Sequence, residues 1–168
     1  MDTNSAQYRA KRPRTALAGP YGHPFHAILV TVPIGAWTAS LIFDVVSFFS
    51  RDYQPFTLGA LWLVGIGIVG AVLAAAVGLM DLQTLETGTK ARRVALTHMT
   101  LNSIAILLFI ASFLIRIFAG WEDVSLVGFI VSLVAFALIG ASGYLGGELA
   151  YHYGVRVADE KTQADGFR

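Results

Sequence analysis

The sequence predicts an all-α integral membrane protein, folded as an antiparallel four-helix bundle with a kinked first helix. Hydrophobic residues make up 55% of the 168 residues and charged residues 14%, with a mean hydropathy of +0.63. A soluble domain carries about a quarter charged residues, so this chain is too apolar to be covered by water. Four apolar runs are each long enough to cross about 30 Å of hydrocarbon as a helix. Short polar links join the runs, which makes neighbouring helices antiparallel.

The runs predict helices because bare backbone cannot face lipid. They extend over about Phe25 to Phe49, Thr57 to Met80, Val94 to Phe118 and Ser125 to Leu149. Pro24 suits the first position of the first helix, where its missing N–H costs nothing. Pro33 lies inside that helix and deprives the carbonyl of Leu29 of its usual partner, so a kink is expected there. The freed carbonyl needs another donor, and the kink should therefore face protein and not lipid.

Rows of small residues mark the second and fourth helices. The rows consist of Gly70, Ala74 and Gly78 in the second helix, and of Gly140, Gly143 and Gly147 in the fourth. Small residues let membrane helices approach closely, so the rows favour close helix contact.

The Lys and Arg residues predict the orientation in the cell membrane. Ten of the twelve lie on the side of the N-terminus, and the other two are Arg51 and Arg116. Cytoplasmic loops carry an excess of Lys and Arg, so we expect a multi-pass protein with both termini in the cytoplasm. The transmembrane domain is expected over residues 22–157. Residues 1–21 and 158–168 are polar and are expected to be tails, the first of them either disordered or lying on the membrane surface.

Two charged residues are expected to pair near the side opposite the termini. Asp44 follows His26 by 18 residues, and Arg116 follows His98 by the same interval. This interval is about five helical turns, so each pair shares a helix face. Charges in a span normally face the bundle interior, and we expect Asp44 and Arg116 to clamp the first and third helices together. The alternative is that each snorkels separately into the head groups. The matched positions are 72 residues apart and suggest a duplicated hairpin.

Polar residues from four stretches should meet on the side of the termini, because antiparallel threading brings them to one level. The set consists of His23, His26, Asp81, His98, Asn102 and Glu148. Several interpretations of this set remain open.

The first interpretation is a haem b site. Haem iron takes imidazole ligands from facing helices, so His23 or His26 would pair with His98. Asn102 would lie one turn beneath His98. The second interpretation is a site for a divalent metal such as zinc or iron. Its ligands would be His23, His26, Asp81, His98 and Glu148.

The third interpretation needs no ligand. The histidines would hydrogen-bond to carboxylates, freed carbonyls and lipid head groups. Asp81 and Glu148 would pair with Arg92 or Arg93. A proton relay or a quinone head-group site is a further alternative.

The composition and the motifs exclude several functions. The chain has no Cys, so thiolate ligands, iron–sulfur clusters and disulfides are excluded. It carries no basic stripe with interleaved aromatic residues, and we expect no nucleic-acid partner. No serine-hydrolase elbow, phosphate loop or zinc-protease motif occurs, so hydrolytic catalysis has no support.

Several short motifs together resemble one family. They are Gly22-His23-Pro24-Phe25-His26, Pro33-Ile34-Gly35, Trp37 and Asp44 near the start, Gly78-Leu79-Met80-Asp81, Ala91-Arg92-Arg93, His98 and Asn102 in the middle, and Gly143-Tyr144-Leu145-Gly146-Gly147, Tyr151 and Gly154-Val155 at the end. Over about residues 22 to 157 the chain resembles the DUF2231 family of uncharacterised bacterial membrane proteins. The resemblance implies a four-helix membrane domain. Some relatives are similar to proteins that carry a Rieske-type iron–sulfur domain, which implies membrane redox chemistry. Many members have His where this chain has Glu148, which weakens a haem ligand on the fourth helix.

The leading functional hypothesis is a non-enzymatic membrane protein with a histidine and carboxylate site on its cytoplasmic side. The site would bind haem or a metal and serve membrane electron transfer. The partners would be the lipid bilayer and another membrane redox or respiratory subunit. The alternative is a structural or assembly subunit of a larger membrane complex or a homo-oligomer, without a cofactor. The small-residue rows discriminate between the two, because rows that face lipid are available to partner helices.

Overall fold

The computed structural model describes residues 5–120 and 122–168, and every regular element in these ranges is helical. In chain order the elements are α1 Ala6–Ala10, η1 Ala16–Ala18, α2 Phe25–Leu29, α3 Thr31–Phe49, α4 Gln54–Leu82, α5 Lys90–Ala119, α6 Leu126–Gly147, η2 Glu148–His152 and α7 Glu160–Asp165. The element η1 is a 3₁₀ turn, and η2 is a π-helical turn that continues α6.

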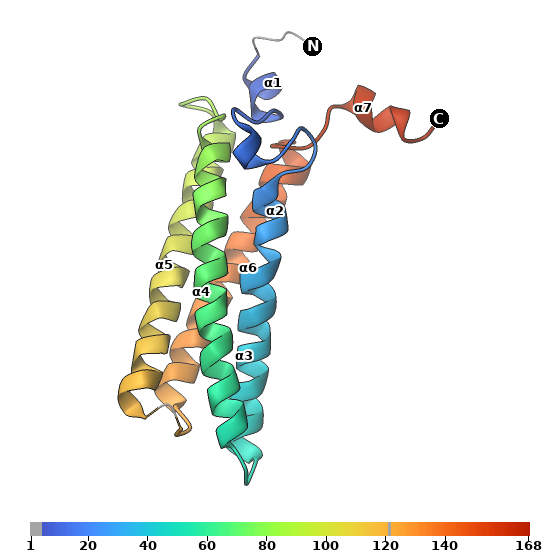
Figure 1. Ribbon diagram of the computed structural model, residues 1–168. Coiled ribbons are helices and arrows are strands. Elements are labelled where there is room, and N and C mark those ends of the chain that lie inside the picture. The colour runs from blue at the N-terminus through green and yellow to red at the C-terminus, as the bar shows by residue number, and fades with distance from the viewer. Residues whose placement is uncertain (1–4, 121) are drawn as a thin grey trace.

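Four long helical spans stand side by side as a bundle (Figure 1). The spans are α2 with α3, α4, α5, and α6 with η2, and each is long and apolar enough to cross a membrane. The helix α3 packs on α4, and α5 packs on α6, which gives two helical hairpins. Both hairpins start at the end of the bundle where the two chain termini lie (Figure 1). The predicted all-α four-helix fold is confirmed.

The first span breaks where the sequence predicts its kink. The helix α2 ends at Leu29, Val30 forms a turn, and α3 starts two residues before Pro33. Pro33 is buried, and a Cβ added at Gly70 of α4 would lie 3.1 Å from its Cδ. The kink therefore faces α4, as a freed carbonyl in a membrane requires.

Hydroxyl side chains cap the N-termini of both helices of the second hairpin. Thr89 Oγ1 accepts from the backbone N–H of Arg92 at 3.2 Å and caps α5. Ser125 Oγ accepts from the backbone N–H of Gly128 at 3.2 Å and caps α6. These caps satisfy N–H groups that the first turn of a helix leaves without a partner.

An aromatic stack fills the middle of the bundle. The rings of Trp37 in α3 and Phe109 in α5 lie nearly parallel, with centres 3.8 Å apart. Both side chains are fully buried, and Trp37 Nε1 donates to the carbonyl of Val64 at 3.3 Å. A Cβ added at Gly67 would clash with the indole nitrogen, so this glycine makes room for the stack. The result is an apolar layer in the middle of the bundle.

The outer faces of the spans are apolar. Trp62, Val69 and Leu107 expose 66%, 62% and 65% of their surface. Such a continuous apolar surface is unfavourable in water and suits the hydrocarbon of a bilayer. Lipid is therefore the environment of these helices.

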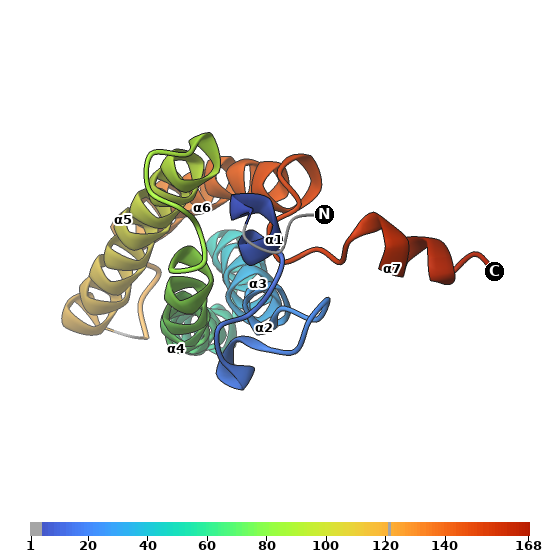
Figure 2. The same cartoon turned by 90° about the horizontal axis from the view of Figure 1, so that it is seen from above.

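The segment before α2 contacts the end of the bundle that carries the termini. Residues 5–21, called the cap segment below, lie across the end of the bundle (Figure 2). The backbone N–H of Arg156 donates to the carbonyl of Ala10 at 3.0 Å. Its Nη2 donates to the carbonyls of Ala18 and Gly19 at 2.8 and 3.0 Å. A distant arginine therefore supplies donors for the backbone carbonyls of this segment, a contact that local composition cannot reveal. Residues 1–4 of the predicted tail lie outside the described residues.

The predicted C-terminal tail contains a short helix. Asp159 caps α7, which projects away from the bundle (Figure 2).

Candidate functional site

Two of the four histidines point into the bundle near the end that carries the termini. His26 lies on α2 and His98 on α5. The Nδ1 of His26 lies 2.9 Å from the carbonyl oxygen of Ala74 on α4, and the Nδ1 of His98 lies 2.7 Å from that of Ser142 on α6. A carbonyl oxygen only accepts, so Nδ1 carries the hydrogen in both rings. A neutral ring of this kind keeps its lone pair on Nε2.

A glycine makes room for each of these rings. A Cβ added at Gly78 would lie 2.9 Å from the Nδ1 of His26. A Cβ added at Gly146 would lie 3.2 Å from the Cε1 of His98. Each imidazole is thereby held against the backbone of the second helix of its own hairpin.

The two hairpins repeat the same construction. Residues separated by 72 positions meet in three layers, His26 with His98, Trp37 with Phe109, and Asp44 with Arg116. The two carbonyls that accept from the histidines are 68 positions apart, and so are the two glycines beside the rings. Equal intervals in corresponding contacts support a duplicated hairpin, with a pseudo-two-fold axis along the bundle.

The two imidazoles lie next to each other, one from each hairpin, in an edge-type contact. Their ring centres are 6.2 Å apart and their planes lie at 82°. Asn102 Nδ2 lies 3.0 Å from the Nε2 of His98 and donates to it, one turn along α5 as the sequence predicts. The Nε2 of His26 has no hydrogen-bond partner among the described residues.

The other members of the predicted cluster have separate partners. His23 is exposed, and its Nδ1 lies 3.3 Å from the carbonyl of Tyr21. Asp81 forms an ion pair with Arg156, with 2.8 Å between its Oδ1 and the Nε of the arginine, and Glu148 accepts from the hydroxyl of Tyr153 at 2.7 Å. The expected arginine partners of these carboxylates bind elsewhere. Arg92 donates to the carbonyls of Leu82 and Leu85, and Arg93 to that of Gly88.

The five-ligand metal site is therefore not assembled. Across residues 5–120 and 122–168, no three His, Asp or Glu side chains gather closely enough to hold a metal ion. In this arrangement His23, Asp81 and Glu148 have other partners, and their role as metal ligands stays a prediction. Reaching the same membrane level is not sufficient, because a ligand must also turn toward the centre of the bundle.

Asp44 and Arg116 form a buried ion pair near the opposite end of the bundle. Arg116 donates from Nη1 and Nη2 to the two carboxylate oxygens at 2.6 and 2.7 Å. Both side chains are 5% exposed. Ser112 Oγ accepts from Arg116 Nε at 3.2 Å and donates to the carbonyl of Gly128 at 2.7 Å. The pair joins α3 and α5 as the shared-face argument expects, and its donors are extensively satisfied.

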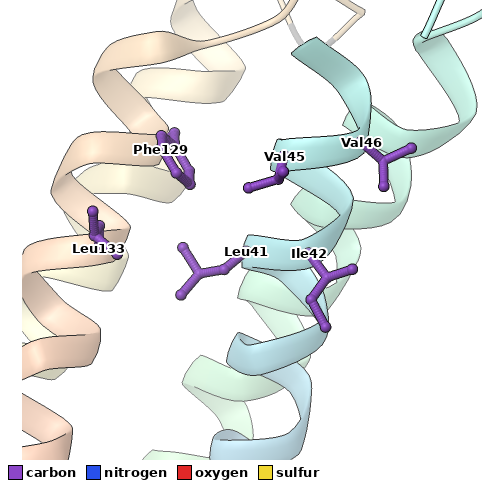
Figure 3. A pocket seen from close by; sticks show the side chains of 6 residues that line it. All are labelled: Leu41, Ile42, Val45, Val46, Phe129 and Leu133. Atoms are coloured by element: carbon purple, nitrogen blue, oxygen red, sulfur yellow. The ribbon is translucent and has the colours of Figure 1, made fainter. Parts of the chain in front are cut away.

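A hollow of about 280 Å³ lies on the outside of the bundle between α3 and α6 (Figure 3). Its lining is wholly apolar and consists of Leu41, Ile42, Val45, Val46, Phe129 and Leu133. It offers no polar group to fix a ligand, and it lies on the membrane-facing surface. This apolar hollow is separate from the histidine pair.

Sequence reasoning missed the groups that orient the histidines. The acceptors at Ala74 and Ser142 are backbone carbonyls, which have no sequence signature. The pairing of Asp81 with Arg156 joins residues 75 positions apart and also has no local pattern. The repeat interval could have identified the Trp37 and Phe109 stack, because these residues keep the spacing of 72.

The family comparison covers the region that contains all four spans. The model of a family described as "Predicted membrane protein (DUF2231)" matches residues 22–159. No curated protein and no solved structure matches the chain. The matched region includes the histidine pair, the aromatic stack and the ion pair. The chain therefore belongs to the DUF2231 family of predicted membrane proteins.

Proposed function

We propose that the protein holds a metal centre between the imidazoles of His26 and His98 and uses it in membrane redox chemistry. The observation that carries the proposal is the common orientation of the rings, each of which donates its Nδ1–H to a backbone carbonyl. Metal-binding histidines are commonly fixed by such a bond, which leaves Nε2 as the ligand atom. The redox role rests on the resemblance of some relatives to proteins with a Rieske-type domain.

The separation of the rings supports a single ion between them. If the two nitrogens bind on opposite sides of the metal, metal–nitrogen bonds of about 2.0–2.1 Å, plus roughly 1 Å from each nitrogen to its ring centre, put the two ring centres about 6 Å apart. The observed separation is 6.2 Å. Perpendicular rings are compatible with this arrangement, because each imidazole can rotate about its own metal–nitrogen bond.

Asn102 sets a condition on binding. Its amide donates to the Nε2 of His98, the same atom that would bind the metal. Binding at His98 therefore requires this amide to turn away, whereas the Nε2 of His26 is already without a hydrogen bond from the described residues. Haem is larger than a bare ion and needs more room between the rings. At Gly78 and Gly146 the helix backbone lies directly against the rings. An iron ion needs less lateral room between the two hairpins than haem b does.

The proposal is tested on the full chain purified in a mild detergent. The absorption spectrum and the bound metal content are measured for the protein and for His26→Gln and His98→Gln. His23→Gln and His152→Gln are the matched controls, because both side chains are exposed and lie outside the pair. We expect stoichiometric metal in the unchanged protein and both controls, and its loss in the two pair variants.

The spectrum separates the two forms of the centre. A Soret band identifies haem, and metal without a Soret band identifies a bare ion. A protein that carries neither after expression with added iron overturns the proposal. Equal loss of metal in the pair variants and the controls also overturns it.

A second candidate function is a structural or assembly subunit, supported by the glycine row of α6. A Cβ added at Gly140, Gly143 or Gly147 would meet nothing within 4 Å. By contrast, the row on α4 lies inside the bundle, where Gly70 and Gly78 contact the first span. An outward row of glycines lets another membrane helix approach closely.

This second function is tested through the oligomeric state in detergent. We expect Gly143→Ile to dissociate an assembly that the unchanged chain forms. Gly35→Ile is the control, because a Cβ at that exposed glycine of α3 also meets nothing within 4 Å. A monomeric unchanged chain, or equal dissociation by both variants, contradicts this function.

A further inference from the structure

A basic hollow lies on the cap segment, apart from the histidine pair. Its volume is about 180 Å³. The lining residues are Tyr8, Arg9, Arg12, Pro13, Arg14 and Thr84. The wall therefore presents three guanidinium groups, a phenol and a hydroxyl group.

Arg12 is fixed in this wall by aromatic rings. Its guanidinium carbon lies 3.7 Å from the ring centre of Tyr8 and 4.7 Å from that of Tyr21. Its Nη2 makes a long bond of 3.5 Å to Asp159. Its Nη1 is buried and has no hydrogen-bond partner in the described part of the chain. Arg12 is thus a cation held in place beside the hollow, and 32% of its side chain is exposed.

Positive charge exceeds negative charge around the hollow. Arg9 binds Glu86 at 2.9 Å, and Arg12 binds Asp159. The exposed side chain of Arg14 has no ion-pair partner among the described residues. Among the described residues, two carboxylates accompany the three guanidinium groups, and each of these carboxylates already binds an arginine.

The hollow lies at the level where α4 leaves the membrane. Thr84 follows the end of α4 at Leu82 by two residues. The element η1 packs on α4, and its Leu17 is 70% exposed. An exposed leucine beside a basic surface is typical of a segment that lies in the head-group layer, with its apolar side chain in the acyl region. This position favours a lipid over a dissolved anion.

We propose that this hollow binds the phosphate of an anionic phospholipid head group. Guanidinium groups bind phosphate through paired, charge-assisted hydrogen bonds, and basic pockets beside membrane helices bind anionic head groups. The volume corresponds to about six waters at about 30 Å³ each, which is enough for a phosphate. Arg12 and Arg14 would supply the bonds, with Leu17 in contact with the acyl chains. This inference does not depend on the proposed metal centre.

The test uses the full chain in detergent with equal amounts of phosphatidylglycerol and phosphatidylcholine. Native mass spectrometry measures which lipid the protein retains. We expect preferential retention of phosphatidylglycerol, weakened about fivefold by Arg12→Gln or Arg14→Gln, since one Lys or Arg near a membrane surface contributes about 1 kcal/mol. Arg168→Gln is the matched control, because it removes an exposed charge on the same side of the membrane.

A second arm replaces the lipid with inorganic phosphate and measures the melting temperature. We expect that inorganic phosphate does not raise the melting temperature of the unchanged protein more than that of Arg14→Gln. A rise that depends on Arg14, without a preference for phosphatidylglycerol, assigns the hollow to a dissolved anion and overturns the proposal. Equal weakening by Arg168→Gln indicates unspecific charge attraction and also overturns it. If Arg12→Gln does not fold, Arg14→Gln decides, because the exposed Arg14 side chain makes no ion pair with any of residues 5–120 and 122–168.

Discussion

Gly78 and Gly146 occupy the two positions where a side chain would meet a histidine ring. Their neighbours are the Nδ1 of His26 and the Cε1 of His98, at 2.9 and 3.2 Å from an added Cβ. A methyl group at either position pushes the imidazole away from the carbonyl that orients it. At the residue scale, these glycines therefore determine the tautomer and direction of the proposed ligand atoms.

We predict that Gly78→Ala and Gly146→Ala each destabilise the protein by about 1–3 kcal/mol, the usual cost of overpacking. The matched controls are Gly140→Ala and Gly143→Ala, where an added Cβ meets nothing within 4 Å. The free energy of unfolding in mixed micelles measures the effect. Nitrogen chemical shifts of the histidine rings report whether Nδ1 still carries the hydrogen. Similar losses in all four variants would contradict this role of the two glycines.

The ion pair of Asp44 and Arg116 is the second determinant at this scale. Both side chains are 5% exposed, so either charge left alone remains away from water. Removing one partner of a buried pair costs about 3–5 kcal/mol, whereas replacing both with apolar groups is often neutral.

We therefore predict that Asp44→Asn lowers the free energy of unfolding by about 3–5 kcal/mol. The combined variant Asp44→Leu with Arg116→Met should recover most of this loss, because no isolated charge remains. Asp52→Asn, at an exposed position in the turn after α3, serves as the control and should change little. A double variant that is less stable than Asp44→Asn would show that the pair contributes net stability.

At the scale of the elements, the stack of Trp37 on Phe109 connects α3 to α5. It lies between the histidine layer and the ion-pair layer and separates them with apolar groups. Side-chain packing, and not a hydrophobic drive against water, holds membrane helices together. The hairpins also meet where α4 packs on α5 and where α3 packs on α6, and the aromatic layer adds a contact across the centre.

We predict that Trp37→Ala destabilises the protein by about 3–5 kcal/mol, the range for removing a buried aromatic side chain. Trp62→Ala is the matched control, because the Trp62 side chain is 66% exposed on the lipid-facing surface. Unfolding in mixed micelles compares the two. A larger loss for Trp62→Ala would mean that lipid contact outweighs the central stack.

The N-terminal cap of α7 lies outside the membrane spans and gives a prediction of pH dependence. Hydrogen bonds from the backbone N–H and the hydroxyl of Thr162 lower the pKa of the Asp159 carboxyl to about 2. A lowered pKa stabilises the capped helix above the ordinary pKa of the carboxyl, and this contribution is lost as the pH falls through about 2. Carbon chemical shifts of Asp159 should show a midpoint near 2, and Thr162→Ala should raise it. A midpoint at the ordinary value of about 3.9 in the unchanged chain contradicts this account.

At the scale of the whole molecule, two similar hairpins stand around a pseudo-two-fold axis. The equivalent residues that meet across the axis are chemically different, Trp37 with Phe109 and Asp44 with Arg116. An exact two-fold repeat would place two like charges together in the ion-pair layer. Divergence of the halves allows one half to neutralise the other, while the histidine layer remains symmetric.

The orientation in the membrane is a prediction at this scale. Because the chain contains no Cys, single cysteines can be added without a background signal. We expect a membrane-impermeant maleimide to label Asp52→Cys in intact cells and to label Ala164→Cys only after permeabilisation. Both positions are exposed, and they lie at opposite ends of the bundle. The reverse labelling pattern would place the histidine pair on the outer side.

The sequence predicts the fold more completely than the site. The kink at Pro33 and the joining of Asp44 to Arg116 follow from residue spacing and from the cost of unsatisfied polar groups in lipid. The cluster of six polar residues does not follow, because it depends on the rotation of each helix about its axis. Of that cluster, His26, His98 and Asn102 come together, and His23 is directed away.

By itself, the sequence determined the four spans, their antiparallel order and the depth of each polar residue. It did so because a bilayer fixes the length and apolarity of every crossing. The tertiary structure alone decided which imidazoles meet and which groups hold them. Those contacts depend on backbone carbonyls of neighbouring helices, and the cap segment is held by Arg156, far along the chain. Such long-range contacts have no local pattern, so they appear only when the helices pack.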